Sequence, residues 1–315
     1  MKYYKNKKIL IAGGSGLVGT NLLIELLKYN KKNVVASYNH SIKEKKLKRF
    51  YKKYNFLKLK DCIEATKNKN IVFILAVKQS GIFNLENNYE DNLIDNFKLR
   101  LNILKSCKIN KVRKIVWVSS STVYQPYNKK IKEEDLDLNK DPYDIYLGTG
   151  WLYRYLEKLF FFYIHKYKMD ISIIRTAAIY GKYDNFDNKK SHVVPALIKK
   201  SLSKNRYLDV WGDPNIVRDF VFAEDLAKAI LLITPKKNIQ LVNFSSGKSL
   251  SIKNLASKIL KISNTKKILR FINKSKSSAK FRVLNNKKFD KYFPSFKRTS
   301  IATGIKETID WYKQK

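Results

Sequence analysis

Short apolar runs alternate with longer segments of helical periodicity through the first half of the chain. Continuous apolar runs are typical of parallel strands that are buried on both faces, and apolar positions three and four residues apart are typical of helices. Alternating strands and helices predict an α/β fold with a doubly wound parallel sheet. Strands are expected at 9–12, 33–37, 56–59, 71–76, 114–118 and 171–174, and helices or helical turns at 17–27, 42–53, 61–67, 89–107 and 146–167.

The pattern changes after about residue 180, where the segments become shorter and mixed. A smaller α+β region closing over the carboxyl ends of the strands fits this change, because ligands of such sheets bind there. The Lys-, Ser- and Asn-rich stretch 273–291 is expected to be a loop or a flap. Helices are expected at about 193–203, 224–233, 251–262 and 301–313, and strands near 207–210, 217–222 and 240–244.

A glycine-rich turn joins the first expected strand to the first expected helix. Glycines let a backbone turn sharply and approach a pyrophosphate without a Cβ in the way, and a helix start offers free N–H groups and a positive dipole end to an anion. Strand, glycine turn and helix in this order predict a dinucleotide site. Its residues are Gly13, Gly16, Leu17, Val18 and Gly19. We therefore expect a Rossmann-like NAD(P)-binding domain over 1–178 and a substrate-binding region over 179–315, some of whose segments return to the sheet.

The end of the second strand bears on which dinucleotide is bound. An acidic residue is expected there for NAD, but the strand runs into Asn39 and no carboxylate follows at once. Lys43, Lys45 and Arg49 come next. A missing acid with nearby cations favours NADP(H) over NAD(H), although the same cations would also suit a solvated helix face.

Composition narrows the class of protein. The formal net charge is +39, and lysines are spread over the whole chain rather than gathered on one stripe. Such a field attracts anionic substrates but does not indicate a specific nucleic-acid partner. No apolar run reaches the ~20 residues that cross a bilayer, so a cytoplasmic protein is expected. Cys62 and Cys107 have no metal-site spacing, and no metal is expected.

Several segments together resemble the extended short-chain dehydrogenases/reductases, the NAD(P)-dependent epimerase/dehydratase family. They are the glycine turn, the Ser-Ser-Ser-Thr-Val-Tyr run at 119–124, and a tyrosine that opens a long helix. Further segments resemble the GDP-fucose synthase group, which are epimerase/reductases of GDP-4-keto-6-deoxymannose. These are 76–82, 180–186, 191–197, 210–214 and 218–221.

The resemblance implies a catalytic apparatus. Tyr146 would donate a proton to the oxygen of the reduced carbonyl, and Ser120 would hydrogen-bond that oxygen. His192 would act as the acid/base of epimerisation, but the cysteine that usually accompanies it is replaced by Thr122. The resemblance also implies cofactor contacts from Asn39, Asp61, Ala76, Ser119 and Tyr146, and substrate contacts from Ser121, Thr122, His192, Lys200, Trp211 and Arg218.

One position departs from the family pattern. The family carries Tyr-x-x-x-Lys, in which the lysine binds the nicotinamide ribose and lowers the tyrosine pKa by its charge. Four residues after Tyr146 this chain has Gly150. Arg154, two helical turns beyond Tyr146 on the same face, is our candidate for a substitute cation.

The function expected from these residues is an NADP(H)-dependent reductase/epimerase of a GDP-keto-deoxyhexose, serving surface polysaccharide synthesis. Two alternatives stay open: another nucleotide-sugar epimerase or dehydratase, or a weakly catalytic cofactor-binding regulatory protein. The resemblance also implies a homodimer formed through the helices at 89–107 and 146–167.

Overall fold

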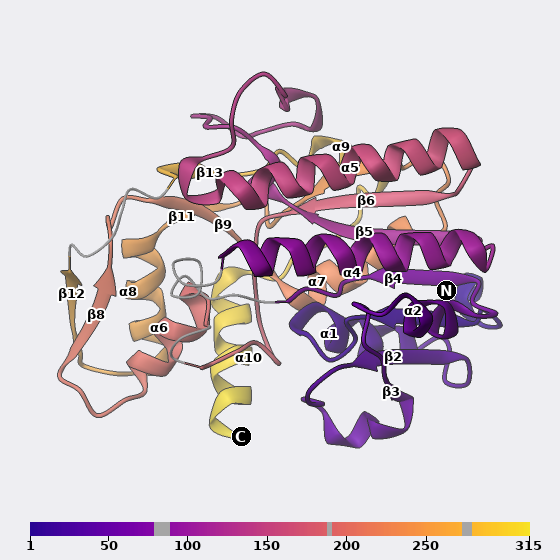
Figure 1. Ribbon diagram of the computed structural model, residues 1–315. Coiled ribbons are helices and arrows are strands. Elements are labelled where there is room, and N and C mark those ends of the chain that lie inside the picture. The colour runs from indigo at the N-terminus through magenta and orange to yellow at the C-terminus, as the bar shows by residue number, and fades with distance from the viewer. Residues whose placement is uncertain (79–88, 188–190, 273–278) are drawn as a thin grey trace.

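A seven-stranded parallel sheet forms the centre of the protein in this computed structural model, which describes residues 1–78, 89–187, 191–272 and 279–315. From β1 the chain moves outward to β3, then crosses to the other side of β1 and adds β4, β5 and β6 (Figure 1). The strand order therefore reverses between β1 and β4. In spatial order the strands are β10 (Leu241–Phe244), β6 (Ile171–Thr176), β5 (Lys114–Ser120), β4 (Ile71–Ile74), β1 (Ile9–Ala12), β2 (Val34–Tyr38) and β3 (Tyr51–Lys53).

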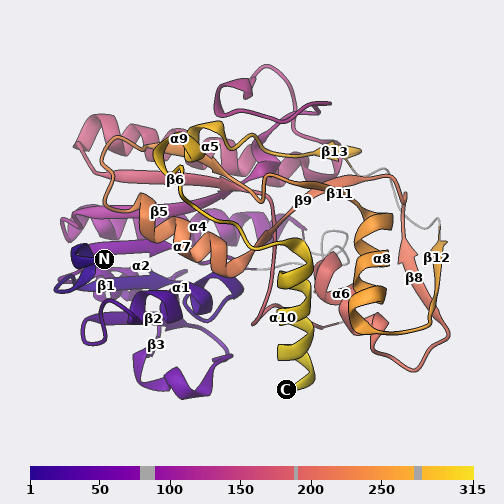
Figure 2. The ribbon, with the colours of Figure 1, turned by 180° about the vertical axis from the view of Figure 1, so that it is seen from behind.

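Helices cover both faces of this sheet (Figures 1 and 2). On one face α1 (Leu17–Leu27) packs against α7 (Ala223–Ile233). On the other face lie α2 (Leu59–Thr66), α4 (Tyr89–Ile109) and α5 (Leu147–Tyr167). The predicted doubly wound parallel sheet is confirmed.

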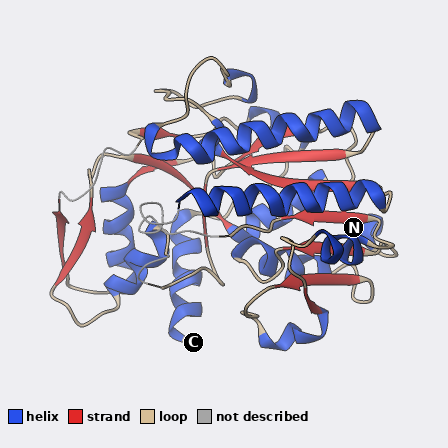
Figure 3. Cartoon of the chain, in the orientation of Figure 1, coloured by secondary structure: helices blue, strands red, loops and turns tan. Residues whose placement is uncertain are grey.

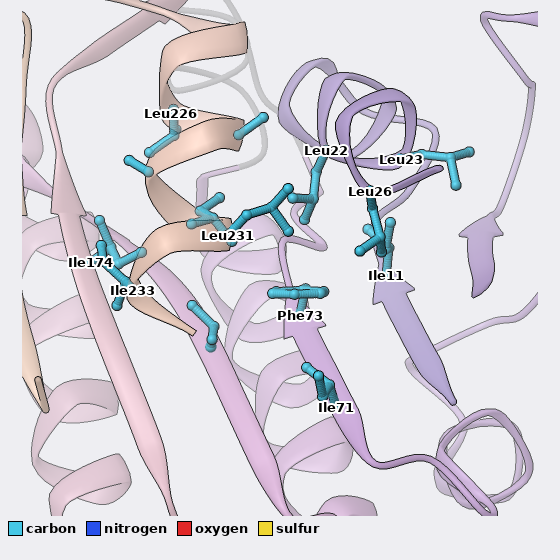
Figure 4. Close-up of a cluster of buried hydrophobic side chains, with 14 of the residues drawn as sticks. Ile11, Leu22, Leu23, Leu26, Ile71, Phe73, Ile174, Leu226, Leu231 and Ile233 are labelled. Carbon is cyan, nitrogen blue, oxygen red and sulfur yellow. The ribbon is translucent and has the colours of Figure 1, made fainter. Parts of the chain in front are cut away.

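Alternate residues of each strand enter the two cores. Ile9 and Ile11 of β1 join the cluster under α1 and α7, whereas Leu10 and Ala12 join the cluster under α4 and α5. Figure 4 shows the first cluster, in which Leu22 and Leu26 of α1 lie close to side chains of β1 and β4. Burial on both faces is the reason why these strands are continuously apolar in the sequence.

Most of the remaining elements lie beyond the carboxyl ends of the large sheet (Figure 3), whereas Tyr4 of η1 and Phe289 of α9 join the core cluster on one face of that sheet. A small sheet has the order β11-β9-β13 with β7 also paired to β9, and β8 pairs with β12. The bounds are β7 (Ala178–Tyr180), α6 (Val193–Ser201), β8 (Tyr207–Trp211), β9 (Val217–Phe222), β11 (Ser249–Ser251), α8 (Ile252–Ser263), β12 (Ile268–Ile272), β13 (Phe281–Arg282), α9 (Lys287–Tyr292) and α10 (Ile301–Lys313). Short 3-10 turns are η1 (Lys2–Tyr4), η2 (Lys45–Phe50), η3 (Ser121–Val123), η4 (Glu133–Asp135) and η5 (Asp144–Tyr146).

Three expectations about elements are corrected. The third strand is β3 rather than 56–59, because the chain pairs with β2 directly after η2 and then turns into α2. The expected helix at 42–53 is therefore only the short turn η2. The expected loop at 273–291 contains β13 and all but the last residue of α9, while 273–278 lie outside the described residues. In the described parts of the chain, no helix is long and apolar enough to span a membrane.

Candidate active site

The glycine turn sits where the strand order reverses, and its glycines are required by close packing. Gly13 has a φ of 91°, and a Cβ on it would lie 2.5 Å from the backbone nitrogen of Ala76, just beyond β4. A Cβ on Gly19 would lie 2.1 Å from the carbonyl oxygen of Gly13. The glycine turn therefore packs directly against the residues that follow β4, and the start of α1 packs directly against the turn. Leu17, Val18 and Gly19 begin α1, where N–H groups have no partner within the helix.

The N-cap of α1 leaves that helix start open to a ligand. Gly16 is the N-cap and supplies no side-chain capping bond. Ser37 at the end of β2 accepts a hydrogen bond of 2.8 Å from the N–H of Gly13, which ties the turn to the neighbouring strand. A helix amino end at the reversal of strand order is the place where such folds bind a pyrophosphate.

The cationic side chains after β2 differ in how accessible they are to a bound cofactor. The neutral residue Asn39 comes first, directly after β2, and is exposed. Lys43 donates a 2.6 Å hydrogen bond to the carbonyl of Tyr183, and burial lowers the pKa of Lys43. Lys45 and Arg49 of η2 are exposed, so these two are better placed than Lys43 to meet an added phosphate.

Two predicted cofactor contacts are bonded to the protein itself. The carboxylate of Asp61, in the first turn of α2, accepts a 2.8 Å hydrogen bond from the N–H of Asn55, which lies in the loop between β3 and α2. The hydroxyl of Ser119 donates a 2.7 Å bond to buried Glu157. Their contact with a cofactor stays a prediction.

Ser120 ends β5 and contacts Thr122 twice. Its Oγ accepts hydrogen bonds from the N–H of Thr122 at 3.2 Å and from the Thr122 hydroxyl at 3.0 Å. Because both contacts are accepted, the Ser120 hydrogen remains able to donate to a ligand. Ser121 is buried beside it in η3.

The position of the missing lysine is occupied by neighbouring atoms. A Cβ on Gly150 would lie 2.5 Å from the ring of Pro142 and 2.6 Å from the carbonyl oxygen of Thr122. The first turns of α5 therefore pack directly on the Ser120–Thr122 turn, and this contact requires glycine.

Tyr146 lies at the end of η5 beside two arginines from distant strands. The guanidinium carbon of Arg282 is 4.6 Å from the centre of the Tyr146 ring. The charge of Arg282, and to a smaller extent that of Arg218, lowers the pKa of Tyr146 against the effect of burial. A phenol beside fixed cations is suited to proton transfer near neutral pH. Nothing in the sequence singled out Arg282, since its place depends on β13 pairing with β9.

Arg154 is not the cation that acts on Tyr146. Its guanidinium donates 2.6 Å bonds to the carbonyls of Val123 and Lys140 and lies over the ring of Trp151. These contacts tie Arg154 to the last residue of η3 and to the loop before η5. The expectation of a substitute cation from α5 is corrected: the arginines that lower the pKa of Tyr146 come from β13 and β9.

The predicted substrate contacts Lys200, Trp211, Arg218 and His192 lie in three places. Lys200 of α6 lies over the ring of Trp211 at 5.1 Å and donates to the carbonyl of Asp209 at 2.8 Å, and the Trp211 side chain is 67% exposed. Arg218 is buried and belongs with Tyr146 instead. His192 is the N-cap of α6 and is exposed. In the described ranges no cluster of three or more His, Cys, Asp or Glu side chains could hold a metal ion.

Comparison with known proteins places the chain in a family. The sequence model of the NAD dependent epimerase/dehydratase family matches residues 9–243. The chain is 27% identical to a GDP-L-colitose synthase of Yersinia pseudotuberculosis, over 97% of each chain. It is 25% identical to a GDP-L-fucose synthase of Dictyostelium discoideum, over 97% of this chain and 95% of that one.

The fold is similar to that of a solved enzyme with a cofactor. A GDP-L-fucose synthetase from Naegleria fowleri bound to NADP superimposes with a TM-score of 0.81. The match covers 98% of this chain and 93% of the other, at 20% identity.

Proposed function

The chain belongs to the NAD dependent epimerase/dehydratase family, and from this premise we propose that it is an NADP(H)-dependent reductase/epimerase of a GDP-linked keto-deoxyhexose. It is an enzyme of that family, with the family's NAD(P)-binding, Rossmann-like fold. The observation that carries the proposal is the cluster of Tyr146, Arg218 and Arg282. A proton donor beside two buried cations is what a keto sugar attached to a diphosphate requires.

The proposed chemistry assigns separate tasks to Ser120 and Tyr146. A reduced dinucleotide held at the glycine turn would supply the hydride that reduces the carbonyl carbon. Ser120, held by Thr122, donates a hydrogen bond to the carbonyl oxygen and orients it. Tyr146 gives its proton to the same oxygen as negative charge develops there, and the cation of Arg282 stabilises the phenolate that remains.

The nucleotide part is proposed to lie along the smaller sheet. Arg218 and Arg282 would hold the diphosphate, since guanidinium groups pair with phosphate oxygens through two parallel bonds. Lys200 and the exposed Trp211 would meet the nucleoside. His192, with Thr122 in place of a thiol, is the proposed acid/base for epimerisation.

NADP(H) is the proposed cofactor. Its pyrophosphate would rest on the start of α1, at Gly13, Gly16, Leu17, Val18 and Gly19, with Asn39, Asp61, Ala76 and Ser119 around it. The absence of a carboxylate at Asn39 and the exposed Lys45 and Arg49 support the 2′-phosphate.

The wider assignment is part of the same proposal. We take residues 1–178 as the cofactor domain and 179–315 as the substrate region, with β10 returned to the large sheet. A homodimer through α4 and α5 fits the exposed apolar residues on those helices. We also propose that the enzyme works in the cytoplasm and serves surface polysaccharide synthesis, in line with the proposed substrate class.

A second candidate is a different nucleotide-sugar epimerase or dehydratase. The packing of Gly150 against Pro142 and Thr122 favours it, because the family's lysine has no room there. A proton-transfer site in which arginines replace that lysine is compatible with a keto group at another carbon of the sugar.

The test is oxidation of NADPH in the presence of GDP-4-keto-6-deoxymannose, with NADH in parallel. We expect turnover with NADPH, and a loss of about 100-fold or more in kcat for Tyr146→Phe. Tyr155→Phe, an exposed tyrosine on α5, is the matched control and should keep full activity. NADPH binding without turnover on any keto sugar would favour a cofactor-binding protein, and turnover only on UDP-linked sugars would favour the second candidate.

A further inference from the structure

A buried ion pair lies beneath the strand end that leads to Ser120. Glu157 of α5 and Arg175 of β6 are both buried, and Arg175 donates to the two carboxylate oxygens at 3.0 Å and 2.7 Å. Ser119 and Arg175 are register partners in the pairing of β5 with β6, so both side chains point to the face that α5 covers. A bidentate pair of this kind fixes the orientation of its partners as well as their charge.

The turn that contains Ser120 is attached to this ion pair at both ends. Before Ser120, the hydroxyl of Ser119 donates a 2.7 Å hydrogen bond to Glu157. After it, the hydroxyl of Tyr124 accepts a 2.8 Å hydrogen bond from Nη1 of Arg175. Tyr124 is fully buried and directly follows η3. The two attachments therefore restrict where the backbone can place the hydroxyl of Ser120.

Tyr124 also connects this turn to the strand that carries Arg282. Its hydroxyl donates a 2.8 Å hydrogen bond to Oδ1 of Asn243 in β10, and the Asn243 amide donates at 2.9 Å to the carbonyl of Ile131. Ile131 exchanges two backbone hydrogen bonds with the segment 283–285, which directly follows β13. A continuous path of hydrogen bonds thus runs from the end of β5 to the end of β13.

The proposed chemistry needs the two ends of this path at a fixed separation. Ser120 and Tyr146 must reach the same carbonyl oxygen, and the guanidinium of Arg282 lies over the ring of Tyr146. A displacement of about 1 Å between reacting groups can lower a rate by about 100-fold. The hydroxyl of Tyr124 is the point at which the two halves of the path meet.

On the basis of the proposed function, we propose that Tyr124 is a positioning residue, which holds Ser120 in place relative to Arg282. It acts through the buried ion pair on one side and through the β10 amide on the other. Loss of its hydroxyl breaks both bonds but leaves the ring packed in the core. The carbonyl is then misaligned during hydride transfer, whereas binding of the cofactor is unaffected.

Tyr124→Phe removes this hydroxyl, and steady-state kinetics with NADPH and GDP-4-keto-6-deoxymannose measure the effect. We expect kcat to fall by about 10- to 100-fold, because the reacting groups lose their alignment. The KM for NADPH should stay close to the wild-type value. The isotope effect on kcat with NADPH deuterated at C4 of the nicotinamide should increase, since hydride transfer then limits turnover more strongly.

Tyr4→Phe is the matched control. Tyr4 is also fully buried, and its hydroxyl donates a 2.6 Å hydrogen bond to the carbonyl of Leu231 in the core cluster under α1 and α7. Both variants should lower the urea midpoint of unfolding by similar amounts, but Tyr4→Phe should keep the wild-type kcat and isotope effect. A folded Tyr124→Phe with the wild-type kcat overturns the proposal, because the hydroxyl would then serve stability alone.

Asn243→Ala breaks the same path one residue further on. If the two residues act through one connection, the double variant with Tyr124→Phe should lose no more kcat than the slower single variant, since their effects are not independent. Losses of kcat that multiply in the double variant would show that the residues act separately, and they would overturn the path.

Failure of the proposed function is visible separately. If the wild type reduces no keto sugar, the proposed reaction is wrong, but hydrogen–deuterium exchange of the unliganded chain still tests the path. Tyr124→Phe should make exchange several-fold faster in peptides that contain Ile131 and 283–285, whereas Tyr4→Phe should leave those peptides as in the wild type. Unchanged exchange there in Tyr124→Phe overturns the connection, whatever the activity.

Discussion

Gly150 allows α5 to pack closely against Pro142 and the η3 turn. Any side chain there would overlap Pro142 and the carbonyl of Thr122. The family's lysine therefore cannot be restored by substitution alone, because the backbone of α5 lies too close to the η3 turn.

We expect Gly150→Ala to lower the free energy of unfolding by about 1–3 kcal/mol, since added atoms in a packed contact force shifts in its neighbours. Urea denaturation followed by circular dichroism measures this. Lys158→Ala on the exposed side of α5 is the control and should stay within about 0.5 kcal/mol of the wild type. A stabilised Gly150→Ala, as expected for alanine in an open helix, would contradict the packing described here.

Asp184 is a buried carboxyl whose charge is poorly compensated. One oxygen accepts a 2.7 Å bond from the N–H of Asn185, and the other has no partner among the described residues. Burial raises the pKa of Asp184 to about 6, although Lys43 acts in the opposite direction.

The folded state therefore holds this proton more firmly than the unfolded state, whose carboxyl titrates near 4. Stability should fall as the pH rises from about 4 to 6 and then level off, by up to about 3 kcal/mol. Asp184→Asn keeps the shape and removes the charge. It should raise the melting temperature at pH 7.5 and leave it nearly unchanged at pH 4, and an equal effect at both values would refute the assignment.

At the scale of elements, the sequence predicts what local pattern determines. The strands at 9–12, 71–74 and 114–120 and the helices α1 and α4 follow from apolar runs and periodicity alone. β12 and β13 were missed because short strands form only where a partner is available, and their partners β8 and β9 lie far away in the chain.

The same distinction holds within the candidate site. The glycine turn and Ser120 were predicted because a strand and a short motif lie side by side in the sequence. Arg282 was not predicted, since its contact with Tyr146 joins β13 to η5 only in the folded chain. The candidate cation Arg154 was reasonable by helical spacing, but spacing does not say which way a long side chain turns.

The outer faces of α4 and α5 carry exposed apolar side chains. Trp151, Tyr155 and Phe162 recur on one side of α5, and Ile94 is exposed on α4. The ring of Tyr155 lies 5.7 Å from that of Phe97, so the two helices present a joint surface (Figure 1). Apolar patches of this kind mark association sites, in line with the proposed homodimer.

Tyr155→Glu should convert the proposed dimer into a monomer, because a charge would be buried without a partner in its interface. Sedimentation velocity at micromolar concentration measures the change. Ile268→Glu, which alters an exposed apolar residue of β12 away from these helices, should leave the dimer intact. A monomeric wild type, or a dimeric Tyr155→Glu, would refute the interface.

The whole molecule carries a large excess of positive charge. Lys and Arg number 65 against 26 Asp and Glu, and the cations are spread along the whole sequence. A field of this size attracts nucleotides from a distance and raises their rate of arrival. Charges at the surface are screened within about 10 Å at 0.1 M salt, whereas the buried pair Arg218 and Arg282 is screened much less.

This difference predicts how salt affects the enzyme. Between 50 and 500 mM sodium chloride, the KM for NADPH should rise by roughly three- to tenfold, because screening weakens long-range attraction to the 2′-phosphate and pyrophosphate. The KM for NADH should rise less, since it lacks the 2′-phosphate that exposed Lys45 and Arg49 are proposed to meet. In contrast, kcat should change little, because Tyr146 and its two arginines are largely shielded from bulk salt. Equal salt effects on the KM values for the two cofactors would contradict the proposed 2′-phosphate site. A kcat that falls in step with rising KM would show that the field of the whole molecule, rather than the buried cluster, controls the chemical step.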